Sequence, residues 1–381
     1  METICRNGSN SSLCGDYTTQ FEDFVPIVRE PYQNIIGAIF ILIIIILSIL
    51  GNVAVILAIV RTPRLREELS SILLINLSLT DLLSATFVMP YTFVALLADE
   101  WLLGPEWCTG QCALNYCCII VSMLTLSMIS IDRHVAIVYP LRYASVITSP
   151  LIYAMSTYTW IQAFAFAAVP IVCKWVVYDY WEIVCAIDWD SYRDHGGLTY
   201  VIVAFVLCFM VPAGIMLVSY IRIYRAAKGH YRRRSCRQQM RTDPHQQKQE
   251  RKVIISLAVV VVMFFICTTP FCVTKVIKIF FSSDVVPVWL NFVATYAQYI
   301  ASATNPFIYG IFRTDFRKAF SRLICSIRVL PYNNNTNTNS INASDKLNNS
   351  VNTHQQYEVN MVKAQTEITL GNYSPASSQH A

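Results

Sequence analysis

Charged side chains are scarce in this chain. Only 14% of its 381 residues are charged and 55% are hydrophobic, whereas about a quarter of the residues in a soluble globular protein are charged. This shortage excludes an ordinary soluble domain. The polar N-terminal segment also lacks the short apolar core of a cleavable signal peptide. We therefore expect the first apolar helix to act as its own insertion signal.

Three further features are absent from the sequence, and each absence disfavours one class of membrane protein. The six histidines are scattered and show no metal-ligand spacing, so a membrane-embedded enzyme would lack its catalytic cluster, and we expect no enzyme. The chain shows no inverted repeat of the kind that transporters carry, although a transporter stays a weaker alternative. No helix-long row of polar residues indicates a channel pore.

Long apolar runs are what the chain does have. A helix of about twenty apolar residues spans a bilayer, and such a segment must be helical to satisfy its own backbone. Seven runs qualify, at about 35–60, 71–97, 108–138, 151–173, 198–224, 252–280 and 287–311. The predicted fold class is an all-α membrane protein, a seven-transmembrane helix bundle.

This bundle, at 35–311, is the central part of four. Residues 1–34 precede it as a short extracellular segment, and 312–325 are predicted to form a short amphipathic eighth helix. The last part, 326–381, is rich in Asn, Ser and Thr and is predicted to be a disordered cytoplasmic tail.

Basic residues set the predicted orientation. Lys and Arg crowd the loop after the first run, the connection between the fifth and sixth runs, and the segment after the seventh. The alternate loops are poor in bases and carry Asp and Glu. We expect a multi-pass plasma-membrane protein whose N-terminus is extracellular. The net charge of +5 then reflects topology and does not indicate nucleic-acid binding.

Covalent modifications follow from this topology. Asn7 and Asn10 each begin an Asn-X-Ser triplet on the outside and are predicted glycosylation sites. Pairing of Cys5 with Cys14 is an open guess. Cys325 ends the amphipathic segment, where palmitoylation and an unmodified thiol are the two alternatives.

An acid and a base interrupt the third run. Asp132 and Arg133 lie at its predicted cytoplasmic end, and Glu250 lies at the same depth near the start of the sixth run. One interpretation is a latch between these two helices, made of these three residues and opened when the sixth helix moves. The other is an Arg133 that snorkels at the membrane edge.

Further markers accompany this pair, one or more per helix and in order. They are Gly51-Asn52-Val53, Asn76-Leu-Ser-Leu-Thr-Asp81, Cys108, Trp160, Pro212 with Tyr220, Pro270, Asn305-Pro-Phe-Ile-Tyr309 and Phe316. Over about residues 35–325 the chain resembles the rhodopsin-like (class A) G-protein-coupled receptors, and parts are similar to amine-like orphan receptors.

The resemblance implies a receptor that transmits an extracellular ligand signal, or basal activity, to heterotrimeric G proteins by outward movement of the sixth helix. Arrestin and receptor kinases are further expected partners. A non-signalling or decoy receptor is the alternative. A disulfide between Cys108 and Cys185 is implied as well. The implied activation residues are Asp132, Arg133, Tyr220, Glu250, Phe264, Thr268, Pro270, Asn305, Pro306 and Tyr309.

Asp81 is an ionisable group deep in the second helix and therefore a functional-site candidate. The resemblance makes it the centre of a sodium site, with Ser122, Ser302 and Asn305 as oxygen ligands. Sodium would be an allosteric ion, and no other cofactor is expected. Ala301 stands where the family has Asn, and a protonated, hydrogen-bonded Asp81 is the alternative.

Thr268 is the largest departure from the family pattern. It stands where the family usually has Trp, two residues before Pro270. We expect altered ligand coupling or an unusual basal activity.

The outer half of the bundle is the expected ligand pocket. Asn115 stands where monoamine receptors carry Asp, and Tyr299 where opsins carry the retinal Lys, which disfavours a conventional amine and a photopigment. The sequence leaves a small molecule or a peptide open. The acidic second outer loop is interpreted as solvated, with attraction of a basic peptide as the alternative. The predicted lining is Asn115, Tyr116, Ile119, Ala204, Cys208, Phe271, Cys272, Lys275, Thr295 and Tyr299.

Overall fold

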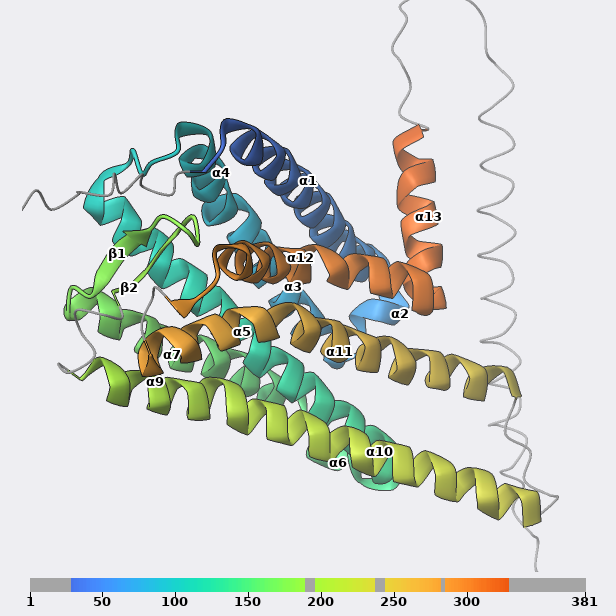
Figure 1. Ribbon diagram of the computed structural model, residues 1–381. Helices are drawn as coiled ribbons and strands as arrows, with labels where there is room; N and C mark the ends of the chain where they lie inside the picture. Colours follow the sequence, from blue (N-terminus) through green and yellow to red (C-terminus); the bar gives the residue numbers. More distant parts are fainter. Residues whose placement is uncertain (1–28, 189–195, 237–243, 282–284, 329–381) are drawn as a thin grey trace, which may run out of the picture. The chain divides into compact units, whose positions relative to one another are not determined.

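A computed structural model of the chain describes residues 29–188, 196–236, 244–281 and 285–328 (Figure 1). Long helices form a bundle in the part that ends at Ile327. The predicted glycosylation sites Asn7 and Asn10, Cys5 with Cys14, and the tail from residue 329 lie outside the described residues.

Seven long helical segments make up the bundle in the described part of the chain. The first helices are α1 (Pro31–Arg61), α2 (Pro63–Arg66), α3 (Ser70–Phe87), α4 (Met89–Ala98), α5 (Gly104–Val138), the 3₁₀ turn η1 (Pro140–Arg142), α6 (Tyr143–Val146) and α7 (Ser149–Val172). The later ones are α9 (Gly197–Phe205), the π-helical turn η3 (Val206–Met210), α10 (Val211–Cys236), α11 (Pro244–Phe280), α12 (Val288–Phe312) and α13 (Thr314–Arg328).

Prolines shape several of these helices because each removes a backbone donor and crowds the preceding turn. Pro90 lies at the start of α4, just after the break from α3 at Val88. Pro270 and Pro306 lie inside α11 and α12. The described segments α3 and α4 together make one membrane-length span.

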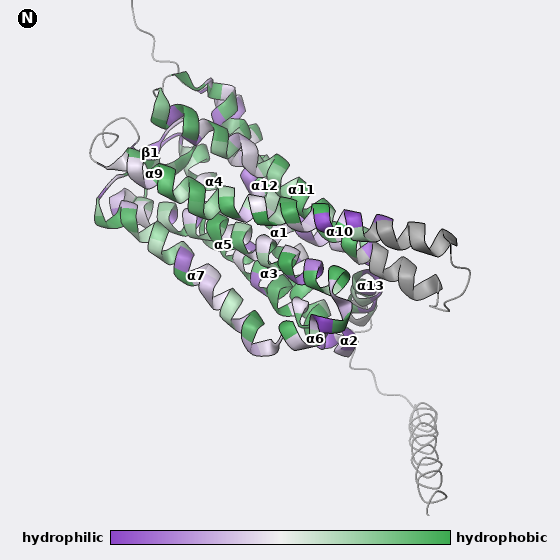
Figure 2. Ribbon diagram, turned by 90° about the horizontal axis from the view of Figure 1, so that it is seen from below, coloured by the Kyte–Doolittle hydropathy of each residue, from purple (hydrophilic) through white to green (hydrophobic). Residues whose placement is uncertain are grey.

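Six helical spans among the described residues are long and apolar enough to cross a membrane. α12 is not one of them, since it carries polar residues such as Asn291, Gln298 and Asn305, which are all buried. Apolar side chains such as Ile39 and Ile43 of α1 are exposed, and Figure 2 shows hydrophobic residues along the bundle helices. These faces suit contact with lipid.

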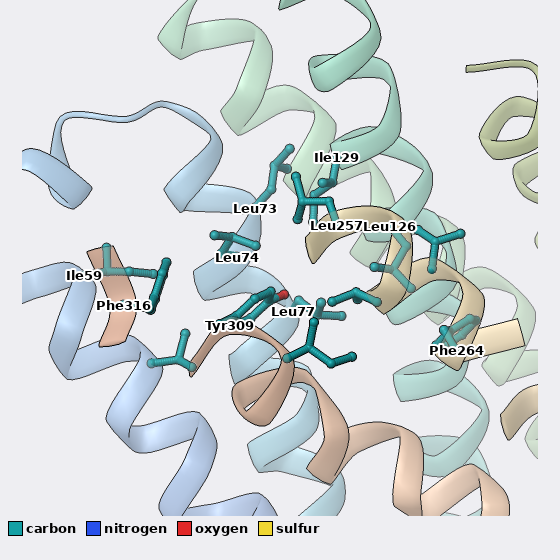
Figure 3. Packing of buried hydrophobic residues seen from close by; sticks show 14 of the residues in the cluster. Ile59, Leu73, Leu74, Leu77, Leu126, Ile129, Leu257, Phe264, Tyr309 and Phe316 are labelled. Atoms are coloured by element: carbon teal, nitrogen blue, oxygen red, sulfur yellow. The ribbon is translucent and has the colours of Figure 1, made fainter. Parts of the chain in front are cut away.

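A continuous cluster of apolar side chains packs the inner part of the bundle next to α13 (Figure 3). Phe316 of α13 is fully buried beside Ile59 of α1, and its ring centroid lies 5.5 Å from that of Tyr309. Lipid tails are as apolar as these side chains, so close packing rather than escape from water stabilises such contacts.

The amphipathic helix α13 runs from Thr314 to Arg328, slightly beyond the predicted 312–325. Phe316 and Ala319 are buried, whereas Arg317 and Arg322 are exposed. Cys325 is exposed on this helix.

A β-hairpin that the sequence did not predict lies at the end of the bundle opposite α2 and α13 (Figure 1). Its strands β1 (Val176–Asp179) and β2 (Val184–Ile187) are antiparallel, and every residue of β2 is buried. A disulfide joins Cys185 of β2 to Cys108 of α5. The implied pairing is therefore present, and it holds the hairpin against the bundle.

Candidate functional site

The predicted pocket residues all lie in the described part of the chain, near the hairpin end or just below it. Six of them are buried, namely Asn115, Cys208, Phe271, Lys275, Thr295 and Tyr299, and four are half-buried, namely Tyr116, Ile119, Ala204 and Cys272. The hairpin turn contacts two of them, because Glu182 pairs with Lys275 and accepts a hydrogen bond from Thr295.

Glu182 of the hairpin turn is the centre of this arrangement. Its carboxylate pairs with two ammonium groups of α11, Lys275 through Oε2 and Lys278 through Oε1, the latter at 2.6 Å. Thr295 of α12 donates a hydrogen bond to the Glu182 carbonyl oxygen at 2.8 Å. Burial alone would raise the pKa of Glu182, but the charges of Lys275 and Lys278 outweigh it and lower that pKa to about 2.

For the described hairpin turn, this geometry corrects the interpretation of the second outer loop as solvated. Glu182 is 2% exposed, and Asp179 is an ion-pair partner of Lys278 at 2.5 Å. The acidic side chains of the turn therefore point at the lysines of α11 instead of facing water.

Uncharged polar groups form a second layer of contacts. Gln298 donates its amide N–H to Asn115 Oδ1 at 2.6 Å, and the hydroxyls of Tyr299 and Thr92 lie 2.8 Å apart. Gln111 accepts the backbone N–H of Cys185 at 3.0 Å. These bonds connect α4, α5 and α12 across the bundle and satisfy polar groups that burial would otherwise penalise.

Two predicted pocket residues lie apart from this group. Cys208 packs against Cys117 and Val121 in a separate cluster, and the Gln162 amide lies 3.6 Å from its sulfur. Ile119 lines the deeper cavity described below.

Sequence reasoning missed Glu182, Lys278 and Gln298 as site residues. Two signals were present. Glu182 lies three residues before Cys185, so the implied disulfide already tied it to the top of α5. Lys278 lies one helical turn after Lys275 and so shares its face of the helix.

Asp81 lies in a small cavity in the middle of the bundle. Asn305 donates to its Oδ2 at 2.9 Å, and Ser302 also interacts with this carboxyl group. The lining includes all four predicted sodium ligands: Asp81, Ser122, Ser302 and Asn305. It also includes Thr268, Phe264 and Ala301, so both departures from the family pattern occur at this cavity.

At the opposite end of α5 from the hairpin, Asp132 and Arg133 form an ion pair. Asp132 is fully buried, and its Oδ2 accepts Arg133 Nε at 2.7 Å. Its Oδ1 accepts the Tyr143 hydroxyl at 2.9 Å, and Arg133 also donates to Ser70 Oγ at 2.8 Å. Burial, followed by the Asp132 charge, raises the pKa of Tyr143 to about 12.

Other predicted activation residues lie in the apolar cluster of the bundle or line the Asp81 cavity. Tyr220, Phe264 and Tyr309 belong to the apolar cluster of Figure 3 or pack against it. The side chain of Glu250 lies outside the described residues, so its half of the latch stays a prediction.

Seven helical segments, a buried charged cluster at the hairpin end and the Asp132–Arg133 ion pair at the other end are together typical of membrane receptors built on a seven-helix bundle. The chain belongs to the rhodopsin family of such receptors, because the family model described as "7 transmembrane receptor (rhodopsin family)" matches residues 51–309. It is thus a class A G-protein-coupled receptor. The family is one of signalling receptors, and its members are multi-pass membrane proteins.

Characterised relatives are similar over most of the chain. The D(1A) dopamine receptor of Didelphis virginiana is 30% identical over 364 residues, which cover 85% of this chain and 81% of that receptor. The D(1A) dopamine receptor of Xenopus laevis is 29% identical over 356 residues, covering 84% and 78%. The 5-hydroxytryptamine receptor 4 of Cavia porcellus is 28% identical over 316 residues, covering 77% and 80%.

A solved structure supports the fold independently. The crystal structure of squid rhodopsin has a TM-score of 0.71 to this chain at 21% sequence identity. It covers 81% of this chain and 90% of the rhodopsin chain. This likeness confirms the seven-helix fold class.

Proposed function

We propose that this receptor lies in the plasma membrane with its N-terminus outside, and transmits an extracellular small-molecule signal to a heterotrimeric G protein. The observation that carries the proposal is the closed cluster of Arg133, Asp132, Tyr143 and Ser70 at one end of α5. It leaves Arg133 engaged inside the receptor, as a resting state requires.

An agonist shifts the receptor only if it binds the active arrangement better than the resting one. In that arrangement the cytoplasmic end of α11 swings outward about Pro270, which lies inside the helix. Arg133 leaves Asp132 and meets the G protein, while Tyr220 and Tyr309 turn inward to support it. The segment η1 and the basic connection between α10 and α11 complete the docking surface.

The relatives are named for dopamine and 5-hydroxytryptamine, which are cationic amines, but the pocket of this chain favours another ligand. Asn115 replaces the acid that monoamine receptors carry on this helix. The buried carboxylate of Glu182 is already engaged by Lys275 and Lys278. A protonated amine would meet two ammonium groups without a carboxylate of its own to bind.

Sodium is the proposed allosteric ion at Asp81. The cavity offers one carboxylate and the side-chain oxygens of Ser122, Ser302 and Asn305, a hard oxygen set that suits such a cation. Ala301 contributes no oxygen from its side chain, so we propose weaker binding than an Asn at this position would give.

Further proposed partners are receptor kinases and arrestin, which would act on the Ser- and Thr-rich residues after 328. Palmitoylation of Cys325 would anchor α13 to the inner leaflet, and the exposure of its thiol supports this.

The test of the proposed function needs no ligand. Basal activation of the main G-protein subtypes is measured in cells for the wild type and for Arg133→Ala at matched surface expression. We expect activation above the level of the variant, in one or a few subtypes. A wild type that equals the variant in every subtype, and stays so through a ligand screen, would support the decoy alternative.

A further inference from the structure

We propose that Lys275 and Lys278 form an anion-binding site in the outer pocket for a ligand that carries a carboxylate, and that Glu182 occupies this site until such a ligand displaces it. The proposal deepens the proposed receptor function and rests on it for its signalling consequence. The binding site itself can be tested without any signalling.

The site is built from buried charges. Lys275 is 7% exposed and Lys278 is 1% exposed, and the two lie one turn apart on α11 with both ammonium groups directed at Glu182. Each carboxylate oxygen of Glu182 meets one ammonium group. A carboxylate on an incoming ligand would find the same two partners in the same arrangement.

Two neighbouring ammonium groups need an anion when they are buried. Buried charge is very costly unless it is paired and hydrogen-bonded, and the two lysines repel each other across one helical turn. Asp179 pairs with Lys278, whereas the described ion pair of Lys275 is with Glu182. Glu182 and Asp179 thus supply carboxylates to these two lysines, and Glu182 is the one that both lysines share.

Glu182 lies on a loop, whereas the two lysines lie on a helix. It belongs to the turn of the two-stranded hairpin, and Lys275 and Lys278 belong to α11. Asp179 Oδ1 accepts the backbone N–H groups of Trp181 and Glu182 at 3.0 Å each. The next residue, Ile183, has φ of +61°, which is rare for a β-branched side chain and stores strain.

The hairpin turn is also held by contacts with Arg29 and Asp99. Arg29 forms an ion pair with Asp99 at 2.9 Å, and its guanidinium lies 3.9 Å from the centre of the Tyr180 ring. The Tyr180 hydroxyl donates to Asp99 at 3.0 Å. These contacts hold the turn in place at Tyr180.

The surroundings specify the rest of the ligand. The Lys275 ammonium lies 5.0 Å from the centre of the Phe271 ring, and the rings of Phe271 and Tyr116 are 6.2 Å apart. Deeper in the pocket, the amides of Asn115 and Gln298 bond to each other. This combination fits a carboxylic acid with an aromatic or other apolar body and one uncharged polar group.

The test fills the site with a small carboxylate after the internal one is removed. Purified full-length Glu182→Ala receptor is heated in detergent with sodium propionate, and the unfolding midpoint is followed. We expect propionate to raise the midpoint by several degrees, and to leave the wild type unchanged because Glu182 already fills its site. Glu182→Ala/Lys275→Met is the matched control, and its midpoint should not respond.

Three comparison compounds at equal concentration complete the experiment, namely propionamide, sodium chloride and sodium methylphosphonate. A response to propionamide or chloride that equals the response to propionate would overturn the anion site or its preference for carboxylates. A larger response to methylphosphonate would overturn the carboxylate assignment in favour of a phosphate group. If Glu182→Ala yields no folded receptor, Glu182→Ser, which also vacates the site, replaces it with the same expected order.

Signalling is read separately in the same variants. If propionate stabilises Glu182→Ala but no variant or compound changes G-protein activation, the anion site stands and the proposed function fails. If activation responds to ligands but the midpoint ignores propionate, the anion site fails and the receptor function stands.

Discussion

Asp132 divides its two carboxylate oxygens between Arg133 and Tyr143. Replacing Tyr143 by Phe removes one hydrogen bond from this buried acid. A hydrogen bond to a charged group contributes about 1.5–3 kcal/mol, so the resting state should lose part of that stabilisation. We expect basal G-protein activation to rise several-fold.

Tyr139→Phe is the matched control, because Tyr139 is 47% exposed and no described hydrogen bond involves its hydroxyl. Equal basal activation of the two variants at matched surface expression would show that Tyr143 does not hold the resting state.

Gly51 of α1 lies directly against Pro306 of α12. A Cβ atom at Gly51 would lie 2.8 Å from Pro306 Cγ and 2.9 Å from Cβ, and the proline ring cannot rotate away. Overpacking of this kind costs about 1–3 kcal/mol, so Gly51→Ala should lower the thermal unfolding midpoint of the purified receptor. Gly214→Ala is the control, since nothing lies within 4 Å of its new methyl group, and its midpoint should hold or rise slightly.

At the scale of elements, the spanning helices could be predicted because a segment in lipid has few other ways to satisfy its backbone. Their ends could not be predicted as well. α11 begins at Pro244, ahead of the predicted 252, because residues such as Gln, Lys and Glu are good helix formers beyond the apolar run.

The hairpin shows why part of the site escaped prediction. Its strands have four residues each, which is too short for a clear alternation of apolar and polar residues. Acidic residues in or beside the strands, such as Asp179 and Glu182, predict a solvent-exposed loop when only the sequence is considered. Only the fold brings Glu182 to Lys275 and Lys278, across 93 and 96 positions of the chain.

This hairpin gives the receptor an acid-sensitive contribution to stability. The pKa of Glu182 is lowered from 4.5 to about 2, so its ion pairs contribute fully above pH 4.5 and are lost as the pH falls toward 2. We expect the unfolding midpoint of the wild type to fall more steeply between pH 4.5 and pH 3 than that of Glu182→Gln. The exposed Glu106→Gln should follow the wild type. Parallel curves for all three proteins would refute the contribution.

On the scale of the whole receptor, Thr268 of α11 lines the cavity around Asp81 together with Phe264 and Asn305. A Trp at this position would extend a larger side chain into that cavity. We expect Thr268→Trp to lower basal G-protein activation by roughly the several-fold that 1 kcal/mol represents. Unchanged basal and ligand-evoked signalling would show that Thr268 does not affect the activity of the receptor.

The polar character of α12 has a consequence for how the receptor is inserted into the membrane during synthesis. Six spans of the described chain are long and apolar enough to cross a bilayer, and α12 is not among them. Its buried Asn291, Gln298 and Asn305 find their places only against the helices already made. We therefore expect α12 to enter the membrane by packing against the earlier six helices, and not by its own hydropathy.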